Sequence, residues 1–173
     1  MDLTDVLLTQ AVKEALGCPR CHGLLEPEVD ESALGCPRCG LRYPVVEGIP
    51  VFLSRDPSGQ EQERRFRDAA AAAQDGNDAV GLLRAVGRYH CRPMMGSYAR
   101  RFRASFGLEE WMLDLGIGYG WPWVHGLQGA RVIGEDISLG NLRLARRLLA
   151  GRGSRVLLVC ASAAALPLRA ATV

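Results

Sequence analysis

The sequence has little of what several protein classes require. Its formal net charge is only +2, and Lys13 is the one lysine among 21 basic residues, so charge alone does not indicate a nucleic-acid partner. Aromatic residues make up 6%, too few to suggest a platform for stacking bases. No run approaches the roughly 20 apolar residues that span a bilayer, so no membrane partner is expected. The acidic start is unlike a secretory signal, and we expect a cytoplasmic protein with reduced cysteines.

What is present indicates a folded, metal-binding chain. The 173 residues suffice for one ordinary domain or two small ones, and 48% hydrophobic with 23% charged residues is a globular composition. Six cysteines in a reducing compartment suggest a metal site before disulfides.

Four of the cysteines form two nearly identical knuckles. Cys18-Pro19-Arg20-Cys21 and Cys36-Pro37-Arg38-Cys39 are separated by 14 residues. Each CxxC turn offers two thiolates, so the two turns complete a closed tetrahedral site for structural zinc. A redox pair or buried free thiols would be the alternative reading of these residues.

The other candidate ligands fit less well. His22 adjoins the first knuckle, but four thiolates already fill the metal's shell, so we expect it near the site or in solvent. Cys91 and Cys160 have no partner at metal spacing, and Cys160 on an apolar segment is read as a core residue.

The knuckles and the segment after them resemble a known family. Residues 16–40 and the segment Tyr43 to Leu53, which reads YPVVEGIPVFL, are similar to the zinc ribbon of tRNA-methyltransferase activator subunits and their bacterial relatives. The resemblance covers about residues 3–54. It implies a ribbon that serves as partner or adaptor for methyltransferases, in a separate subunit or in one chain, and that contacts RNA or protein.

Hydrophobic periodicity predicts the order of elements. A helix is expected over 3–16, extended segments over 43–46 and 49–53 around a turn at Glu47-Gly48, and a linker over 54–59. Helices are expected over 60–74, 79–89 and 97–106. Strands are expected over 111–115, 131–134 and 155–160, and a helix capped by Ser138 over 138–150. This order is the βαβ pattern of a parallel sheet.

We therefore predict an α/β chain in three parts. Residues 1–55 form a zinc ribbon, 56–108 a helical linker or cap, and 109–173 a partial Rossmann-like parallel sheet of about three strands.

A glycine-rich turn follows the first strand of this sheet. Asp114 precedes Gly116, Gly118 and Gly120, and Asp136 at the end of the next strand comes 20 residues after Gly116. A carboxylate at that point can hold a ribose, and no lysine follows as a Walker loop requires. Nicotinamide dinucleotides use a similar layout, but their fingerprint is GxGxxG. An NAD-dependent oxidoreductase is therefore the weaker alternative.

Three segments resemble class I methyltransferases over residues 98–173. They are the DLGIGYG turn, the GEDIS segment after the second strand and the AAALPL segment near the end. The resemblance implies S-adenosylmethionine as cofactor, with Asp114 and the three glycines beside its amino-acid part. It further implies Asp136 on the ribose hydroxyls and Ile137 beside adenine. Ser162 stands where relatives have an aspartate, and Tyr98 where they place an aromatic residue, although Tyr98 equally fits helix packing.

The same resemblance indicates an incomplete domain. Relatives continue into a fourth strand that pairs with the first, so segment 111–115 would otherwise be an exposed apolar edge. We expect a truncated product, or another chain that completes the sheet, and no catalytic residue can be named.

Two functions follow from these observations. One is methyl transfer to RNA or a small molecule. The alternative is a non-catalytic adaptor or activator of a partner methyltransferase. Arginine runs at 64–67 and 100–103, with Arg143, Arg146 and Arg147, read as solvated helix faces before RNA contacts.

Overall fold

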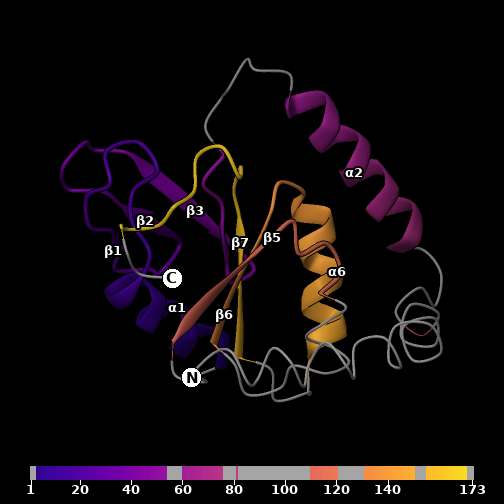
Figure 1. Cartoon of the computed structure of the whole chain (residues 1–173), viewed down its shortest axis with the longest axis horizontal. Helices are drawn as coiled ribbons and strands as arrows, with labels where there is room; N and C mark the ends of the chain where they lie inside the picture. The colour runs from indigo at the N-terminus through magenta and orange to yellow at the C-terminus, as the bar shows by residue number, and fades with distance from the viewer. Residues whose placement is uncertain are drawn as a thin grey trace.

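The computed structural model describes residues 3–53, 60–75, 81, 110–120, 131–150 and 155–170. Its elements form a small antiparallel ribbon, a parallel sheet and helices packed around them (Figure 1). In chain order they are α1 (Leu3–Glu14), β1 (Glu26–Pro27), β2 (Ala33–Gly35), β3 (Arg42–Val46), β4 (Ile49–Pro50), α2 (Gln60–Asp75), β5 (Trp111–Leu115), β6 (Arg131–Asp136), α6 (Leu139–Leu149) and β7 (Arg155–Cys160).

The ribbon is a meander of four short strands in the order β1-β2-β3-β4, all antiparallel. The two predicted extended segments are confirmed as β3 and β4. They meet at a turn in which Glu47 and Gly48 both have left-handed backbones, with φ of 52° and 75°. Glycine adopts this conformation without cost, whereas a residue with a β-carbon adopts it at some strain.

The three predicted strands after residue 109 form a parallel sheet in the order β5-β6-β7. The connecting helix α6 begins as expected, because Ser138 Oγ accepts a hydrogen bond from Asn141 N at 3.1 Å. Strand β6 continues two residues beyond its predicted end, so Glu135 and Asp136 belong to the sheet. Among the described strands β5 lies at one edge, and Leu115 there is 53% exposed.

The two faces of this sheet are covered by different parts of the chain. Neighbouring residues of a strand point to opposite faces, so Ile133 and Leu157 pack in one hydrophobic cluster while Val132 and Leu158 pack in another. The first cluster includes α1 and the ribbon, and the second includes α6. Figure 1 shows α1 and the ribbon on one side of the strands and α6 on the other. Helix α1 and the ribbon therefore pack together on one face of the parallel sheet.

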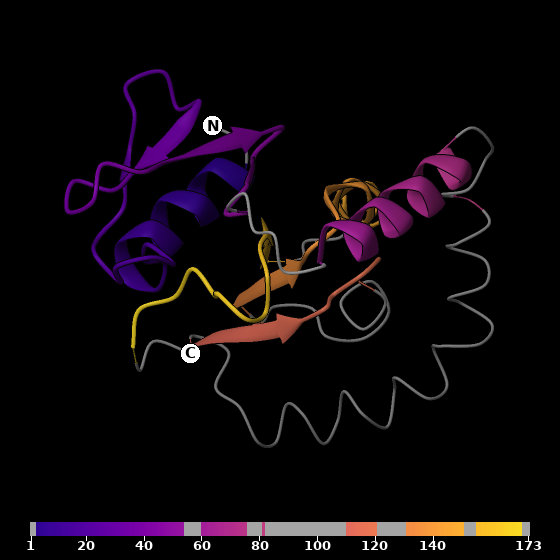
Figure 2. The ribbon, with the colours of Figure 1, turned by 90° about the horizontal axis from the view of Figure 1, so that it is seen from above.

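The ribbon also extends the sheet at its β7 edge. Val51, directly after β4, forms a parallel bridge with Cys160, and Phe52 N donates a 2.7 Å hydrogen bond to the Cys160 carbonyl. The segment after β7 in turn runs back beside α1, where Gly17 N donates to the Pro167 carbonyl at 2.9 Å (Figure 2). Ribbon and sheet are thus interleaved in one unit.

The prediction of a helix at 60–74 is confirmed by α2, which packs on α6. The predicted linker at 54–59 and the helices at 79–89 and 97–106, with Cys91 and Tyr98, lie outside the described residues. Within the described part of the chain, no helix is long and apolar enough to cross a membrane.

A polar contact joins the C-terminal end of α1 to the start of the sheet. Trp111 Nε1 donates a 2.7 Å hydrogen bond to the Glu14 carboxylate, which also pairs with Arg131. The Arg131 guanidinium lies 4.3 Å from the centroid of the Trp111 ring. These hydrogen bonds, from Trp111 first and Arg131 second, lower the pKa of Glu14.

We predict that Glu14→Gln weakens this joint. The substitution should lower the free energy of unfolding by about 1 kcal/mol at pH 7, because it removes a partly exposed charge that accepts two hydrogen bonds. The folded-state pKa of Glu14 lies below its ordinary value of 4.5, so its contribution is present above that pH and is lost as pH falls.

Urea unfolding of the wild type and Glu14→Gln should therefore differ at pH 7, and the difference should shrink progressively as the pH falls below 4.5. Glu26→Gln, at an exposed ribbon glutamate, is the control. A difference that stays constant with pH would contradict the account.

Candidate functional site

The two cysteine knuckles have the same backbone structure. In the first, Cys18 N donates to the Gly23 carbonyl at 2.9 Å and His22 N donates to the Cys18 carbonyl at 2.8 Å. The second knuckle repeats this pattern: Cys36 N donates to the Leu41 carbonyl and Gly40 N donates to the Cys36 carbonyl, both at 2.8 Å. His22 and Gly40 occupy equivalent left-handed positions, with φ of 57° and 71°. His22 is thus a turn residue with an exposed side chain, as expected.

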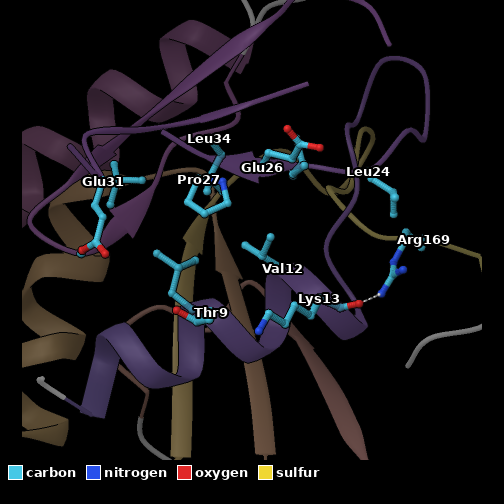
Figure 3. A pocket seen from close by; sticks show the side chains of 13 residues that line it. Thr9, Val12, Lys13, Leu24, Glu26, Pro27, Glu31, Leu34 and Arg169 are labelled. Atoms are coloured by element: carbon cyan, nitrogen blue, oxygen red, sulfur yellow. Dashed lines mark hydrogen bonds between the residues drawn. The ribbon is translucent and has the colours of Figure 1, made fainter. Parts of the chain in front are cut away.

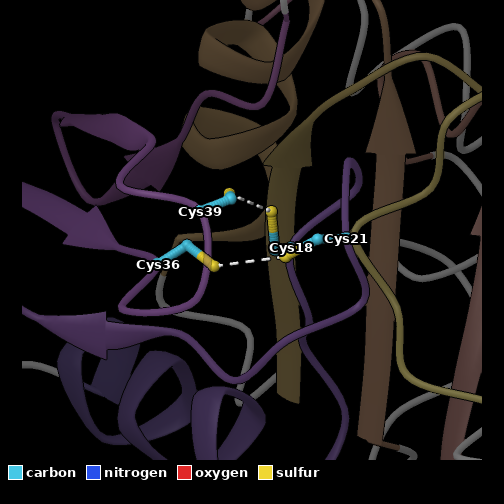
Figure 4. A group of neighbouring side chains, drawn as sticks. All are labelled: Cys18, Cys21, Cys36 and Cys39. Carbon is cyan, nitrogen blue, oxygen red and sulfur yellow. Dashed lines mark hydrogen bonds between the residues drawn. The ribbon is translucent and has the colours of Figure 1, made fainter.

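The knuckles bring four sulfur atoms together (Figure 4). All four Sγ atoms lie within 4.8 Å of one another. Cys18 Sγ is 3.6 Å from Cys39 Sγ, and Cys21 Sγ is 3.5 Å from Cys36 Sγ. A tetrahedral zinc site with Zn–S bonds of about 2.3 Å places its sulfurs about 3.8 Å apart. The cluster therefore fits one tetrahedral zinc ion, with no open position for water.

Protonation of the metal-free thiols favours the same conclusion. Burial raises the pKa of Cys18, but hydrogen bonds from the Tyr43 hydroxyl and nearby backbone N–H groups bring it down to about 6. The Gly23 N–H lowers the pKa of Cys21, yet burial and the neighbouring sulfurs raise it to about 12. A second thiolate beside the first is unfavourable unless a cation lies between them.

Tyr43 is part of this site, and the sequence did not point to it. Its hydroxyl lies 3.0 Å from Cys18 Sγ and donates to the thiolate. Tyr43 lies on β3, and its ring packs against that of Phe52 with 5.0 Å between the ring centroids. This contact fixes the position of the hydroxyl. Outer hydrogen bonds of this kind orient a ligand and tune its basicity.

A second group of predicted residues lies at the carboxyl ends of β5 and β6. Gly116 and Gly118 have φ of 66° and 54°, a conformation that glycine adopts readily. Ile117 N donates to the Glu135 carbonyl at 2.8 Å, which holds the turn against the end of β6. We call Asp114, the turn 116–120, Glu135 and Asp136 the glycine cradle.

Two buried carboxylates bind the backbone of the cradle. Asp136 accepts hydrogen bonds from Gly118 N at 3.0 Å and from Ser138 N at 2.8 Å, and Glu135 accepts one from Gly116 N at 3.3 Å. Burial raises the pKa of Glu135, the Gly116 N–H lowers it, and the charges of Asp136 and Asp114 raise it, so that it reaches about 7. The cradle therefore brings three carboxyl groups, those of Asp114, Glu135 and Asp136, to the carboxyl ends of β5 and β6.

The remaining predicted residues surround the cradle less closely. Ile137 directly follows β6 and is half-buried. Ser162 follows β7, and its Oγ accepts a 3.2 Å hydrogen bond from Ala164 N within a local turn. Cys160 is buried in the core as expected.

Helix α2 contributes a contact that the sequence pattern did not reveal. Asp68 Oδ1 accepts hydrogen bonds from Ser138 Oγ at 2.5 Å and from Gly140 N at 3.0 Å, so it caps the start of α6 from outside. A β-carbon at residue 140 would lie 2.9 Å from Ala71 Cβ, so glycine allows the two helices to approach.

Five of the described arginines on helices, Arg64, Arg65, Arg67, Arg143 and Arg146, pair with glutamates. On α2, Arg65 pairs with Glu61 at 2.8 Å and Arg67 with Glu63 at 2.7 Å. These pairs neutralise charge that phosphate groups would otherwise meet, in keeping with solvated helix faces. The run at 100–103 lies outside the described residues.

A groove of about 570 Å³ opens between α1 and the ribbon strands, apart from both sites. Leu24, Leu34 and Val12 contribute to its apolar lining, and Arg169 at its end donates a 2.6 Å hydrogen bond to the Lys13 carbonyl (Figure 3). The groove contains neither a cysteine nor a residue of the cradle.

Comparison with known proteins identifies the ribbon. Residues 13–48 match the family described as Trm112p-like protein. The match includes both knuckles and ends at the turn between β3 and β4. No curated protein matches the chain. Together with the cysteine cluster, the match shows a small zinc-ribbon-like region at the N-terminal side of an α/β chain, and it does not extend to the cradle.

We predict that Tyr43→Phe weakens zinc binding without removing it. Loss of the hydroxyl should lower zinc affinity about tenfold, because Cys18 loses a hydrogen bond to its thiolate while the ring packing remains. Competition with a chromophoric chelator measures the affinity.

Cys36→Ser is the companion variant, and it should abolish stoichiometric zinc in metal analysis by mass spectrometry. An unchanged affinity in Tyr43→Phe would show that the hydroxyl has no part in the site.

Proposed function

We propose that the chain is a zinc-ribbon adaptor of the methyltransferase-activator kind and that its ribbon acts on the α/β half of its own chain. The Trm112p-like match and the cysteine cluster support the adaptor type. We further propose that the α/β half is of the Rossmann-like methyltransferase kind, and that zinc is the metal of the ribbon.

The way the ribbon contacts the sheet carries this proposal. Ala11 of α1 and Ala15 directly after the helix are fully buried in the same cluster as Ile133, Leu157 and Val159 of the sheet. Burial of such apolar surface stabilises by about 25 cal/mol per Å². At the edge, the bridge from Val51 to Cys160 adds a further strand position. The ribbon thus supplies both a covering helix and an edge segment to an α/β unit.

The same surfaces of the ribbon also allow a comparison with the alternative, an adaptor that acts on a separate enzyme. A partner methyltransferase would need a surface of the ribbon, and α1 and the segment after β4 already bind the chain's own sheet. A partner that bound to these surfaces would have to displace these contacts. Adaptor action within the chain is therefore the better-supported form.

A chain cut between its parts tests the proposal. We predict that a chain with a protease site introduced within 54–59 stays associated after cleavage, because the contacts of α1 and Val51 do not depend on chain connection. Size-exclusion chromatography of the cleaved, zinc-loaded protein should show one peak containing both pieces. Addition of a strong chelator should separate them, since metal binding and folding of so small a ribbon are coupled.

The uncut protein under the same chelator is the control for aggregation. Separation of the two pieces while zinc remains bound would overturn adaptor action within the chain.

A second candidate function is binding of S-adenosylmethionine at the glycine cradle, as a step towards methyl transfer to RNA or a small molecule. The buried carboxylates Glu135 and Asp136 support it, because this cofactor carries a sulfonium and an ammonium group and its ribose offers hydroxyl donors. When bound, it would supply an electrophilic methyl group. Asp114 and the turn 116–120 would hold the amino-acid part, Asp136 the ribose, and Ile137 and Ser162 would face adenine.

The cradle fits a dinucleotide less well. A pyrophosphate needs free backbone N–H groups and a positive surrounding. The N–H groups of Gly116 and Gly118 are directed at carboxylates instead. These contacts favour the sulfonium cofactor over NAD.

Calorimetry separates these ligands. We predict that S-adenosylmethionine binds the zinc-loaded chain and NAD does not, and that Asp136→Asn weakens binding at least about tenfold, as loss of hydrogen bonds to a charged group implies. Asp30→Asn, at an exposed ribbon aspartate, is the matched control. Absence of binding heat with S-adenosylmethionine would exclude the second candidate and leave the adaptor proposal standing.

A further inference from the structure

Helix α6 is the element that contacts both the ribbon and the glycine cradle. Its inner face, with Leu142 and Ala145, shares one hydrophobic cluster with Ile49 of the ribbon and Ile117 of the glycine turn. A displacement of α6 would therefore change the packing of both Ile49 and Ile117, because close-packed side chains transmit a shift of one element to its neighbours.

The ribbon also contacts α6 through a polar side chain, that of Glu47. Its carboxylate accepts hydrogen bonds from Arg143 Nε at 3.1 Å and from an Arg146 guanidinium nitrogen at 2.9 Å. The Glu47 carbonyl also accepts a hydrogen bond from Arg146. A glutamate in a left-handed turn, with φ of 52°, thus holds two successive turns of the helix.

Both ends of α6 support the cradle. Ser138, which caps the helix, donates its N–H to Asp136, and Asp136 in turn accepts from Gly118 N. Leu149 lies against the glycine turn, since a β-carbon at residue 120 would be 3.4 Å from Leu149 Cδ1. The cradle therefore rests on α6 at both the first and the last turn of the helix.

We propose that Glu47 is a positioning residue through which the ribbon fixes α6 and thereby orders the glycine cradle. The inference rests on the proposed adaptor function and names the contact that transmits it. It assigns to the turn between β3 and β4 a task distinct from metal binding.

Hydrogen exchange of the full, zinc-loaded chain tests this role. In Glu47→Ala, amides of the glycine turn (116–120) should exchange about three- to tenfold faster, because two partly exposed ion pairs to α6 are lost. Zinc should stay bound at one ion per chain, since no sulfur ligand is touched.

The matched control is Glu31→Ala. Glu31 is another exposed ribbon glutamate with a left-handed backbone, at φ of 56°, and Arg143 and Arg146 of α6 pair with Glu47 and not with Glu31. Its exchange at the glycine turn should equal that of the wild type.

Arg146→Gln tests the same contact from the helix side, and it keeps the inference falsifiable if Glu47→Ala loses zinc or unfolds. It should accelerate exchange at the glycine turn in the same way. The double variant should show little further acceleration, because both substitutions remove one shared contact.

The outcomes distinguish the two proposals. Faster exchange that is confined to the β3–β4 turn and to α6 itself would overturn the positioning role of Glu47. If chelation of zinc speeds exchange at the glycine turn of the wild type while Glu47→Ala does not, the adaptor function stands and this inference fails. If chelation leaves the glycine turn unchanged, the adaptor function fails.

Discussion

The structure depends on the burial of one face of a parallel sheet beneath the helix of a zinc ribbon. Parallel strands need cover on both faces, because each face carries apolar side chains. Here α6 covers one face, and α1 together with the ribbon covers the other. The ribbon is therefore a structural layer of the α/β half, in addition to being a metal-binding module.

The fold of the ribbon depends in turn on its four cysteines. A ribbon of four strands, the longest with five residues, has a small core, and a structural metal commonly supplies the folding free energy of such modules. The fold of the ribbon then places α1, Val51 and Glu47 against the sheet and its helix. These contacts connect the ribbon that holds the cysteine cluster with the sheet and helix that hold the glycine cradle.

The sequence predicted those features that repeat or that depend on local periodicity. Two equal CxxC spacings predicted the sulfur cluster, and alternating strand and helix patterns predicted the parallel sheet and the cap at Ser138. Contacts between distant parts could not be predicted in the same way. Glu14, Glu47 and Asp68 look like ordinary surface acids in the sequence, and only the folded chain brings them to Trp111, to α6 and to Ser138.

Simultaneous loss of the metal site and of the sheet on unfolding tests the central claim most directly. Cobalt in place of zinc gives thiolate absorption bands that report the ribbon, while all three tryptophans lie between residues 111 and 123 and report the α/β half. With increasing urea, cobalt absorption and tryptophan fluorescence should change in one coincident transition, as expected for a shared core. Two separate transitions, with tryptophan fluorescence unchanged after cobalt is lost, would contradict the account.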